Sequence, residues 1–192
     1  DLADTYDMEI IARLSNPPAW TRALTDTIGT AAPPDNFADF GDFAATVAQR
    51  YQGRIRYYQI WNEPNGNQEW GLQDVNPEAY TELLCEGYRR IKEVDPEAVI
   101  LAAALTPTLA MDGRHMNDLI FLQRMYNAGA ADCFDVASAQ GYGLWSGATD
   151  RRLRPTVINY PHNLFIRDLM VRNGDATKPI WISEMGWNVA PE

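Results

Sequence analysis

Five short apolar segments alternate with four longer amphipathic segments along the chain, and this alternation restricts the possible folds more than any other feature. The apolar segments are residues 8–14, 55–61, 98–105, 134–143 and 178–187, and the amphipathic segments are 37–53, 76–96, 116–130 and 156–174. Short continuous apolar runs are typical of buried strands, whereas the longer runs repeat with the period of a helix. Because no hairpin signal joins consecutive strands, we predict a parallel sheet covered by helices.

Local signals predict where some of the helices begin and end. Asn76 is a good N-cap and Pro77 is favourable at the first helical position, so a helix should begin there. Glycines at 53 and 129 should end the helices that precede them. Pro161 should break the last amphipathic segment or delay the start of its helix.

Two parallel α/β architectures fit this order of elements: an open doubly wound sheet, or part of a (β/α)8 TIM barrel. No glycine-rich GxGxxG or GxxxxGK[ST] motif follows a predicted strand, which disfavours the nucleotide-binding versions of both. A complete barrel usually needs about 250 residues. With five strands in 192 residues, the chain would be one incomplete barrel domain spanning residues 1–192.

Composition excludes several classes of partner. The net charge of −10 disfavours nucleic acid and anionic membranes, and no apolar run is long enough to span a bilayer. The chain begins at Asp1 without a signal-peptide pattern, so its compartment is not predicted. Cys85 and Cys133 have no metal-binding spacing; we expect two free thiols, with a disulfide as the alternative. His115 and His162 also lack ligand spacing, so we expect no metal and no cofactor.

Two glutamates occupy equivalent positions at the ends of predicted strands. Glu63 lies in IWNEPN after the second strand, and Glu184 lies in WISEMGW at the end of the fifth. Functional residues of parallel α/β folds gather at the carboxyl ends of strands. Three strand–helix units separate the two acids, a spacing that places them on opposite walls of a closed barrel but far apart in an open sheet. The pair therefore favours the barrel, the alternative being two unrelated acids that form salt bridges or cap helices.

Two carboxyl groups that face each other are what cleavage of a glycosidic bond requires. One must be protonated to assist the leaving oxygen, and the other must be ionised. Unequal burial and mutual repulsion separate the pKa values of such a pair. Asn62, next to Glu63, is placed to donate a hydrogen bond to a sugar hydroxyl.

The segment IWNEPN followed by PIWISEMGW resembles the two signature segments of clan A retaining glycoside hydrolases, with the nearest likeness to family 39-like and family 5-like members. The resemblance covers essentially the whole chain. It implies that the five strands are the third to seventh of a barrel whose first, second and eighth strands are absent. It also implies that Glu63 is the acid/base, Asn62 the partner of the sugar 2-hydroxyl and Glu184 the nucleophile.

Further candidates come from the same resemblance and from the loops. Tyr142, in AQGYG, matches a tyrosine that such enzymes place beside the nucleophile, although Gln140 and Gly141 stand where relatives have His and Pro. Arg13 either faces the site or pairs with an acid. Four tryptophans in loops after strand ends are able to stack on a sugar. Of these residues, Trp187 is the best candidate; the others are Trp20, Trp70 and Trp145.

Two functional hypotheses follow, both with a carbohydrate partner. The first is hydrolysis of β-linked saccharides by retaining double displacement. The second is a non-catalytic carbohydrate-binding protein on a decayed or truncated barrel. An unrelated α/β enzyme has no motif of its own to support it. An arc of five strands leaves two open edges, so we expect poor activity from residues 1–192 alone.

Overall fold

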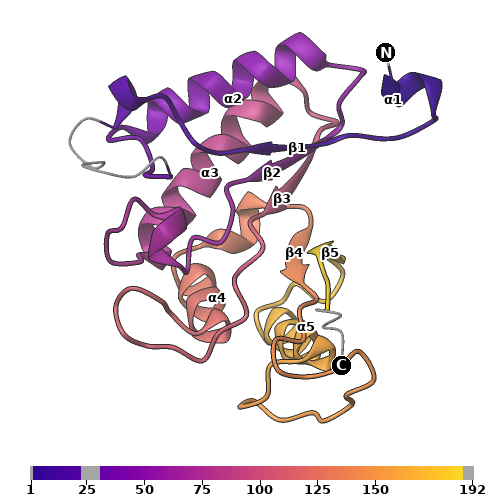
Figure 1. The fold of residues 1–192 in the computed structure, drawn as a ribbon. Coiled ribbons are helices and arrows are strands. Elements are labelled where there is room, and N and C mark those ends of the chain that lie inside the picture. Colours follow the sequence, from indigo (N-terminus) through magenta and orange to yellow (C-terminus); the bar gives the residue numbers. More distant parts are fainter. Residues whose placement is uncertain (1, 23–30, 188–192) are drawn as a thin grey trace.

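The computed structural model describes residues 2–22 and 31–187, and it contains every predicted strand and helix (Figure 1). The strands are β1 Ile11–Leu14, β2 Tyr57–Ile60, β3 Val99–Ala102, β4 Ala137–Gln140 and β5 Ile180–Glu184. The α-helices are α1 Leu2–Thr5, α2 Phe37–Tyr51, α3 Pro77–Val94, α4 Asp118–Asn127 and α5 Asn163–Arg172. Four short 3-10 helices are η1 Ala19–Thr21, η2 Asn67–Glu69, η3 Ala130–Cys133 and η4 Tyr160–His162. Among these α-helices, only α1 was not predicted.

Asparagine side chains fix the starts of three helices. Asn36 precedes α2, Asn76 precedes α3 and Asn117 precedes α4, and each side-chain oxygen accepts from a backbone N–H of the first turn. Such caps satisfy donors that have no partner inside the helix. The prediction at Asn76 is confirmed. The delayed start near Pro161 is also confirmed, because Pro161 lies in η4 and α5 begins at Asn163.

The strands are parallel and follow one another in chain order. β1, β2 and β3 form one sheet, β4 and β5 form a second, and an isolated parallel bridge between Leu101 and Val136 joins them. The helices α2, α3, α4 and α5 pack against one another in the same order. Figure 1 shows them along one side of the strands, with β1 and β5 at opposite ends of the row. The predicted parallel α/β arrangement is confirmed.

The row of strands is curled, so strands that are distant in sheet order approach each other. The ring of Tyr57 on β2 lies 5.2 Å from the ring of Trp181 on β5, measured between centroids. On β1, Arg13 contacts Glu184 at the end of β5, with 3.3 Å between nitrogen and oxygen. Neighbouring strands are about 4.8 Å apart, so these contacts cannot form across a flat sheet of five strands. The curl identifies the partial barrel and rules out the open sheet.

The hydrophobic core lies between the strands and the helices. It includes the fully buried side chains of Tyr58, Ile60, Leu83 and Ile100. Trp70 is also in the core, 3 % exposed and edge-on to Trp61. Trp70 therefore packs as a core residue and is not available for sugar stacking, contrary to its candidacy above.

Cys85 on α3 and Cys133 in η3 form a disulfide, so the expectation of two free thiols is wrong. The two residues are 48 apart in sequence, but α3 and η3 pack together and bring their Cα atoms to 4.7 Å. This distance lies in the range that a disulfide requires. No pattern of local spacing reports such a contact, which is why the sequence favoured the wrong alternative.

Among residues 2–22 and 31–187, no helix is both long enough and apolar enough to cross a membrane.

Candidate active site

The backbone around Glu63 adopts an unusual conformation. Trp61 has a φ of +71° and Glu63 a φ of +41°, both in the left-handed region that side chains other than glycine rarely adopt. Residues in this region cost free energy and concentrate at functional sites, where the surrounding structure holds them in place. The left-handed turn at Trp61 ends β2 and explains why the strand is shorter than its apolar run.

Hydrogen bonds from three directions hold this segment. The backbone N–H of Trp61 donates to Leu14 O (2.9 Å), and that of Glu63 donates to Ala104 O (3.0 Å). The Trp61 indole N–H donates to the backbone oxygen of Glu69 (2.7 Å). The strand end is therefore fixed by the end of β1, by the loop after β3 and by η2.

Glu63 is half-buried, and Gln140 is its hydrogen-bond partner. Gln140 is the last residue of β4 and is 3 % exposed, and its side-chain nitrogen donates to Glu63 Oε1. It also lies in register with Glu184 on β5. No role was predicted for Gln140. Its position at a strand end was the available signal, although the 77 residues between it and Glu63 conceal the contact.

Glu184 contacts two side chains, a guanidinium and a phenol. Arg13 Nη1 lies 3.3 Å from Glu184 Oε1, and the Tyr142 hydroxyl donates to Glu184 Oε2 at 3.0 Å. Arg13 therefore both faces the site and pairs with an acid. The contact expected between Tyr142 and Glu184 is present in the structure.

Glu69, at the end of η2, is a third acid beside the pair and was not predicted. The side-chain nitrogen of Asn62 donates to Glu69 Oε1 at 3.4 Å. Burial raises the pKa of Glu69, and the charges of Glu63 and Glu184 raise it further, against the lowering effects of Asn62 and Arg13. We call Glu63, Glu69, Glu184 and Arg13 the carboxyl site.

Both predicted catalytic acids affect the pKa of Tyr142. Its pKa is raised first by burial, then by the hydrogen bond and the charge of Glu184, and also by the charge of Glu63. The charges of both carboxyl groups thus raise the pKa of the Tyr142 phenol, as they raise the pKa of Glu69. The structure therefore brings the neighbourhoods of Glu63 and Glu184 together from strand ends far apart in sequence.

Two polar atoms of predicted substrate-binding residues are buried without a partner among the described residues: Asn62 Oδ1 and Trp187 Nε1. Asn62 is 7 % exposed, and its amide nitrogen is already engaged by Glu69. Trp187 packs on Gly143, where an added Cβ would lie 2.3 Å from the indole nitrogen. Unsatisfied buried polar atoms are rare in native proteins and often belong to binding sites.

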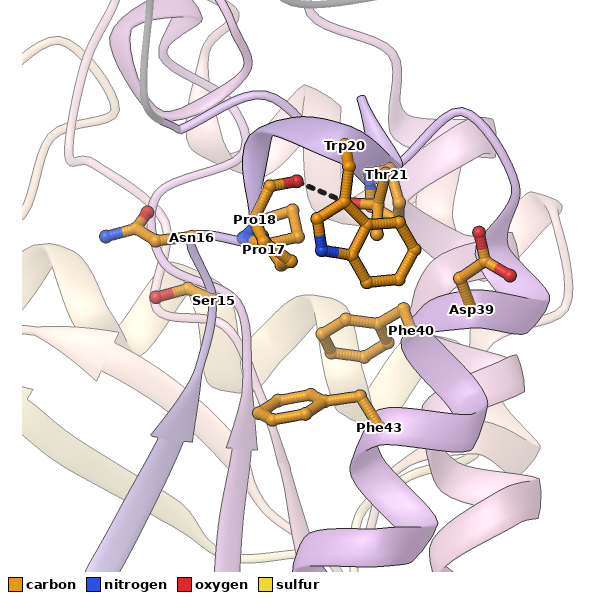
Figure 2. Close-up of a pocket in the computed structure, with 10 residues that line it drawn as sticks. Ser15, Asn16, Pro17, Pro18, Trp20, Thr21, Asp39, Phe40 and Phe43 are labelled. Carbon is orange, nitrogen blue, oxygen red and sulfur yellow. Dashed lines mark hydrogen bonds between the residues drawn. The ribbon is translucent and has the colours of Figure 1, made fainter. Parts of the chain in front are cut away.

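Two of the remaining tryptophans lie away from these contacts. Trp145 is fully exposed, and Trp20, 76 % exposed, lines a separate pocket of about 200 Å³. Figure 2 shows this pocket between the loop after β1 and helix α2, with Trp20 beside Phe40 and Phe43. No residue of the carboxyl site lines it.

The described residues contain no group of three or more His, Cys, Asp or Glu side chains arranged to hold a metal ion. Asp118 on α4 and His162 in η4 form a buried pair with 2.9 Å between nitrogen and oxygen, and this pair joins two elements of the helical layer.

Comparisons with known proteins bear on the fold. No family model and no curated protein matches the chain. Among solved structures, the chain is similar to a family 39 glycoside hydrolase from Bacteroides cellulosilyticus WH2, with a TM-score of 0.69 and 19% identity over 97% of this chain and 37% of that structure.

A monomeric β-xylosidase from Caulobacter crescentus CB15 has a TM-score of 0.64 and 19% identity over 99% of this chain and 41% of its own. A family 128 endo-β-1,3-glucanase from Sorangium cellulosum has a TM-score of 0.60 and 12% identity, covering 100% of this chain and 62% of its own. The chain thus spans about two fifths of the first two structures. Its fold is that of part of a (β/α)8 barrel, as the resemblance implied.

Proposed function

We propose that this chain carries the catalytic centre of a retaining glycoside hydrolase that acts on β-linked saccharides. The observation that carries the proposal is the unequal set of partners around the two acids. Glu184 has a guanidinium at 3.3 Å and a phenol donor at 3.0 Å. A cation and a phenol donor both stabilise negative charge on the oxygens that they contact. Glu63 instead accepts a hydrogen bond from the neutral amide of Gln140.

The proposed reaction proceeds in two displacements. Glu184 attacks the anomeric carbon and forms a glycosyl–enzyme ester while the bond to the leaving oxygen breaks and Glu63 protonates that oxygen. Glu63 then takes a proton from water as the water attacks the anomeric carbon and releases Glu184. Asn62 is the proposed partner of the sugar 2-hydroxyl, with its unpartnered Oδ1 as acceptor. Tyr142 holds the nucleophile, and Trp187 offers its free indole N–H to the sugar.

The test uses the longest natural polypeptide that contains this chain, assayed on 4-nitrophenyl β-glycosides. Glu184→Ala should abolish turnover, and azide should restore part of it as the glycosyl azide of inverted configuration. Glu63→Ala should lose most activity on substrates with poor leaving groups and least on activated ones. Glu97→Ala, an exposed residue before β3, is the matched control.

Near-wild-type rates in both glutamate variants would reject the assignment. Saccharide binding without turnover in the unmodified protein would instead favour the alternative, a carbohydrate-binding protein on the same barrel. The departure at Gln140 and Gly141 from the His and Pro of the resembling enzymes is the feature that supports this alternative.

A further inference from the structure

Glu69 reaches the carboxyl site through two contacts that fix both its backbone and its side chain. Its backbone oxygen accepts from the indole of Trp61, and its Oε1 accepts from the amide of Asn62. The second carboxylate oxygen has no hydrogen-bond partner in the part of the chain that the structure describes. A half-buried acid held by one neutral amide thus keeps acceptor capacity beside Glu63 and Glu184.

The charges of this site are unbalanced. The site has three carboxyl groups and one guanidinium, that of Arg13, which contacts Glu184. The charges of Glu63, Glu184 and Arg13 all act on Glu69. The chain as a whole carries a net charge of −10, the same sign as the local excess. Beside these acids, the 7 % exposed side chain of Asn62 presents a buried oxygen without a partner, which is an independent sign that a ligand donor belongs there.

We propose that Glu69 is a specificity-determining residue, which binds hydroxyl groups of an uncharged saccharide and excludes uronic acids from the subsite beside Asn62. A carboxylate forms strong charge-assisted hydrogen bonds with hydroxyl donors. A second carboxylate on the sugar would meet like charges in a partly buried site, where repulsion is only weakly screened. The kinetic measurement of this inference rests on the proposed function. The discrimination between charged and uncharged sugars should appear in binding affinity as well.

The experiment compares a glucoside and a glucuronide, which differ only in the oxidation of C6. In the longest natural polypeptide that carries this chain, kcat/KM is measured at pH 7 for 4-nitrophenyl β-D-glucoside and 4-nitrophenyl β-D-glucuronide. Affinity for the two methyl glycosides is measured by titration calorimetry. The variants are Glu69→Gln, which keeps the shape, and Glu69→Asp, which keeps the charge. Glu97→Gln, with the same loss of charge on an exposed loop, is the control.

We expect the unmodified protein to prefer the glucoside by about a hundredfold or more, and Glu69→Gln to reduce this preference by about tenfold. Glu69→Asp and Glu97→Gln should keep it within about threefold. A structural role would lower the values for both sugars equally and leave their ratio unchanged.

An unchanged ratio in Glu69→Gln, with turnover intact, overturns the role of Glu69 and leaves the proposed function standing. Discrimination by affinity that depends on Glu69, without any turnover, overturns the hydrolase and leaves the role of Glu69 standing. Failure to bind or cleave either sugar overturns both.

Discussion

The hydroxyl of Tyr142 donates to Glu184 at 3.0 Å, and removing it isolates one hydrogen bond to the proposed nucleophile. We expect Tyr142→Phe to lower kcat/KM about tenfold, because a hydrogen bond to a charged group contributes about 1.5 kcal/mol at a half-exposed site. Tyr6→Phe, at an exposed position, should leave kcat/KM unchanged, and an unaltered kcat/KM in Tyr142→Phe would remove Tyr142 from the centre.

Single residues were predictable where position along a strand was enough. Glu63 lies just after a strand and Glu184 ends one, and the gathering of such positions at one edge of a parallel sheet needs no knowledge of contacts. Tyr142 was a candidate through the family resemblance. Gln140 and Glu69 were missed because their contacts depend on how the chain turns after β2. That turn uses positive φ at Trp61 and Glu63, which no residue type there announces.

At the scale of elements, the disulfide between Cys85 and Cys133 ties α3 to η3 and yields a stability prediction. Closing a loop of 48 residues removes entropy from the unfolded chain worth about 4 kcal/mol. We expect the Cys85→Ser/Cys133→Ser double variant to unfold at a temperature about 10 °C lower than the unmodified protein. A reducing agent should lower the unfolding temperature of the unmodified protein by a similar amount. The reducing agent should leave the double variant unchanged. If mass spectrometry of the digested, unreduced protein recovered the two cysteine peptides as separate peptides, this result would contradict the disulfide.

Helix starts were easier to predict than strand ends for a local reason. A cap such as Asn76 acts within three residues, so its signal is contained in the sequence around it. A strand ends where its neighbour stops pairing with it or where the backbone turns, and both depend on distant residues. The apolar run 98–105 therefore continues past the end of β3 at Ala102 into a buried loop.

At the scale of the whole molecule, the sequence spacing of the two glutamates predicted that the row of strands is curled. Glu63 and Glu184, three strand–helix units apart, required a curved row of strands, and the contacts of Arg13 with Glu184 and of Tyr57 with Trp181 show that curve. The contacts themselves were not predictable, because each joins strands that are not neighbours in the sheet.

The two outer strands yield the last prediction. Within the described residues, β1 pairs only with β2 and β5 only with β4. The outer strands are also the more exposed: Ile11 on β1 is 47 % exposed, and no residue of β5 is fully buried, whereas β4 is buried throughout. Open apolar edges of this kind attract other chains and leave the site without its remaining walls. We therefore expect residues 1–192 alone to bind a hydrophobic dye such as ANS and to self-associate.

Turnover by residues 1–192 alone should be at least about a hundredfold below that of a longer polypeptide that closes the barrel, because small displacements of catalytic groups have effects of that size. Dye binding, light scattering and kcat/KM measured on both proteins test this expectation together. The longer polypeptide is the control: there the same β1 and β5 side chains should be covered, and dye binding should fall as turnover rises. Strong hydrolysis by purified residues 1–192 would mean that the arc from β1 to β5 is sufficient, and that Arg13, Tyr142 and Gln140 hold the two glutamates without further support.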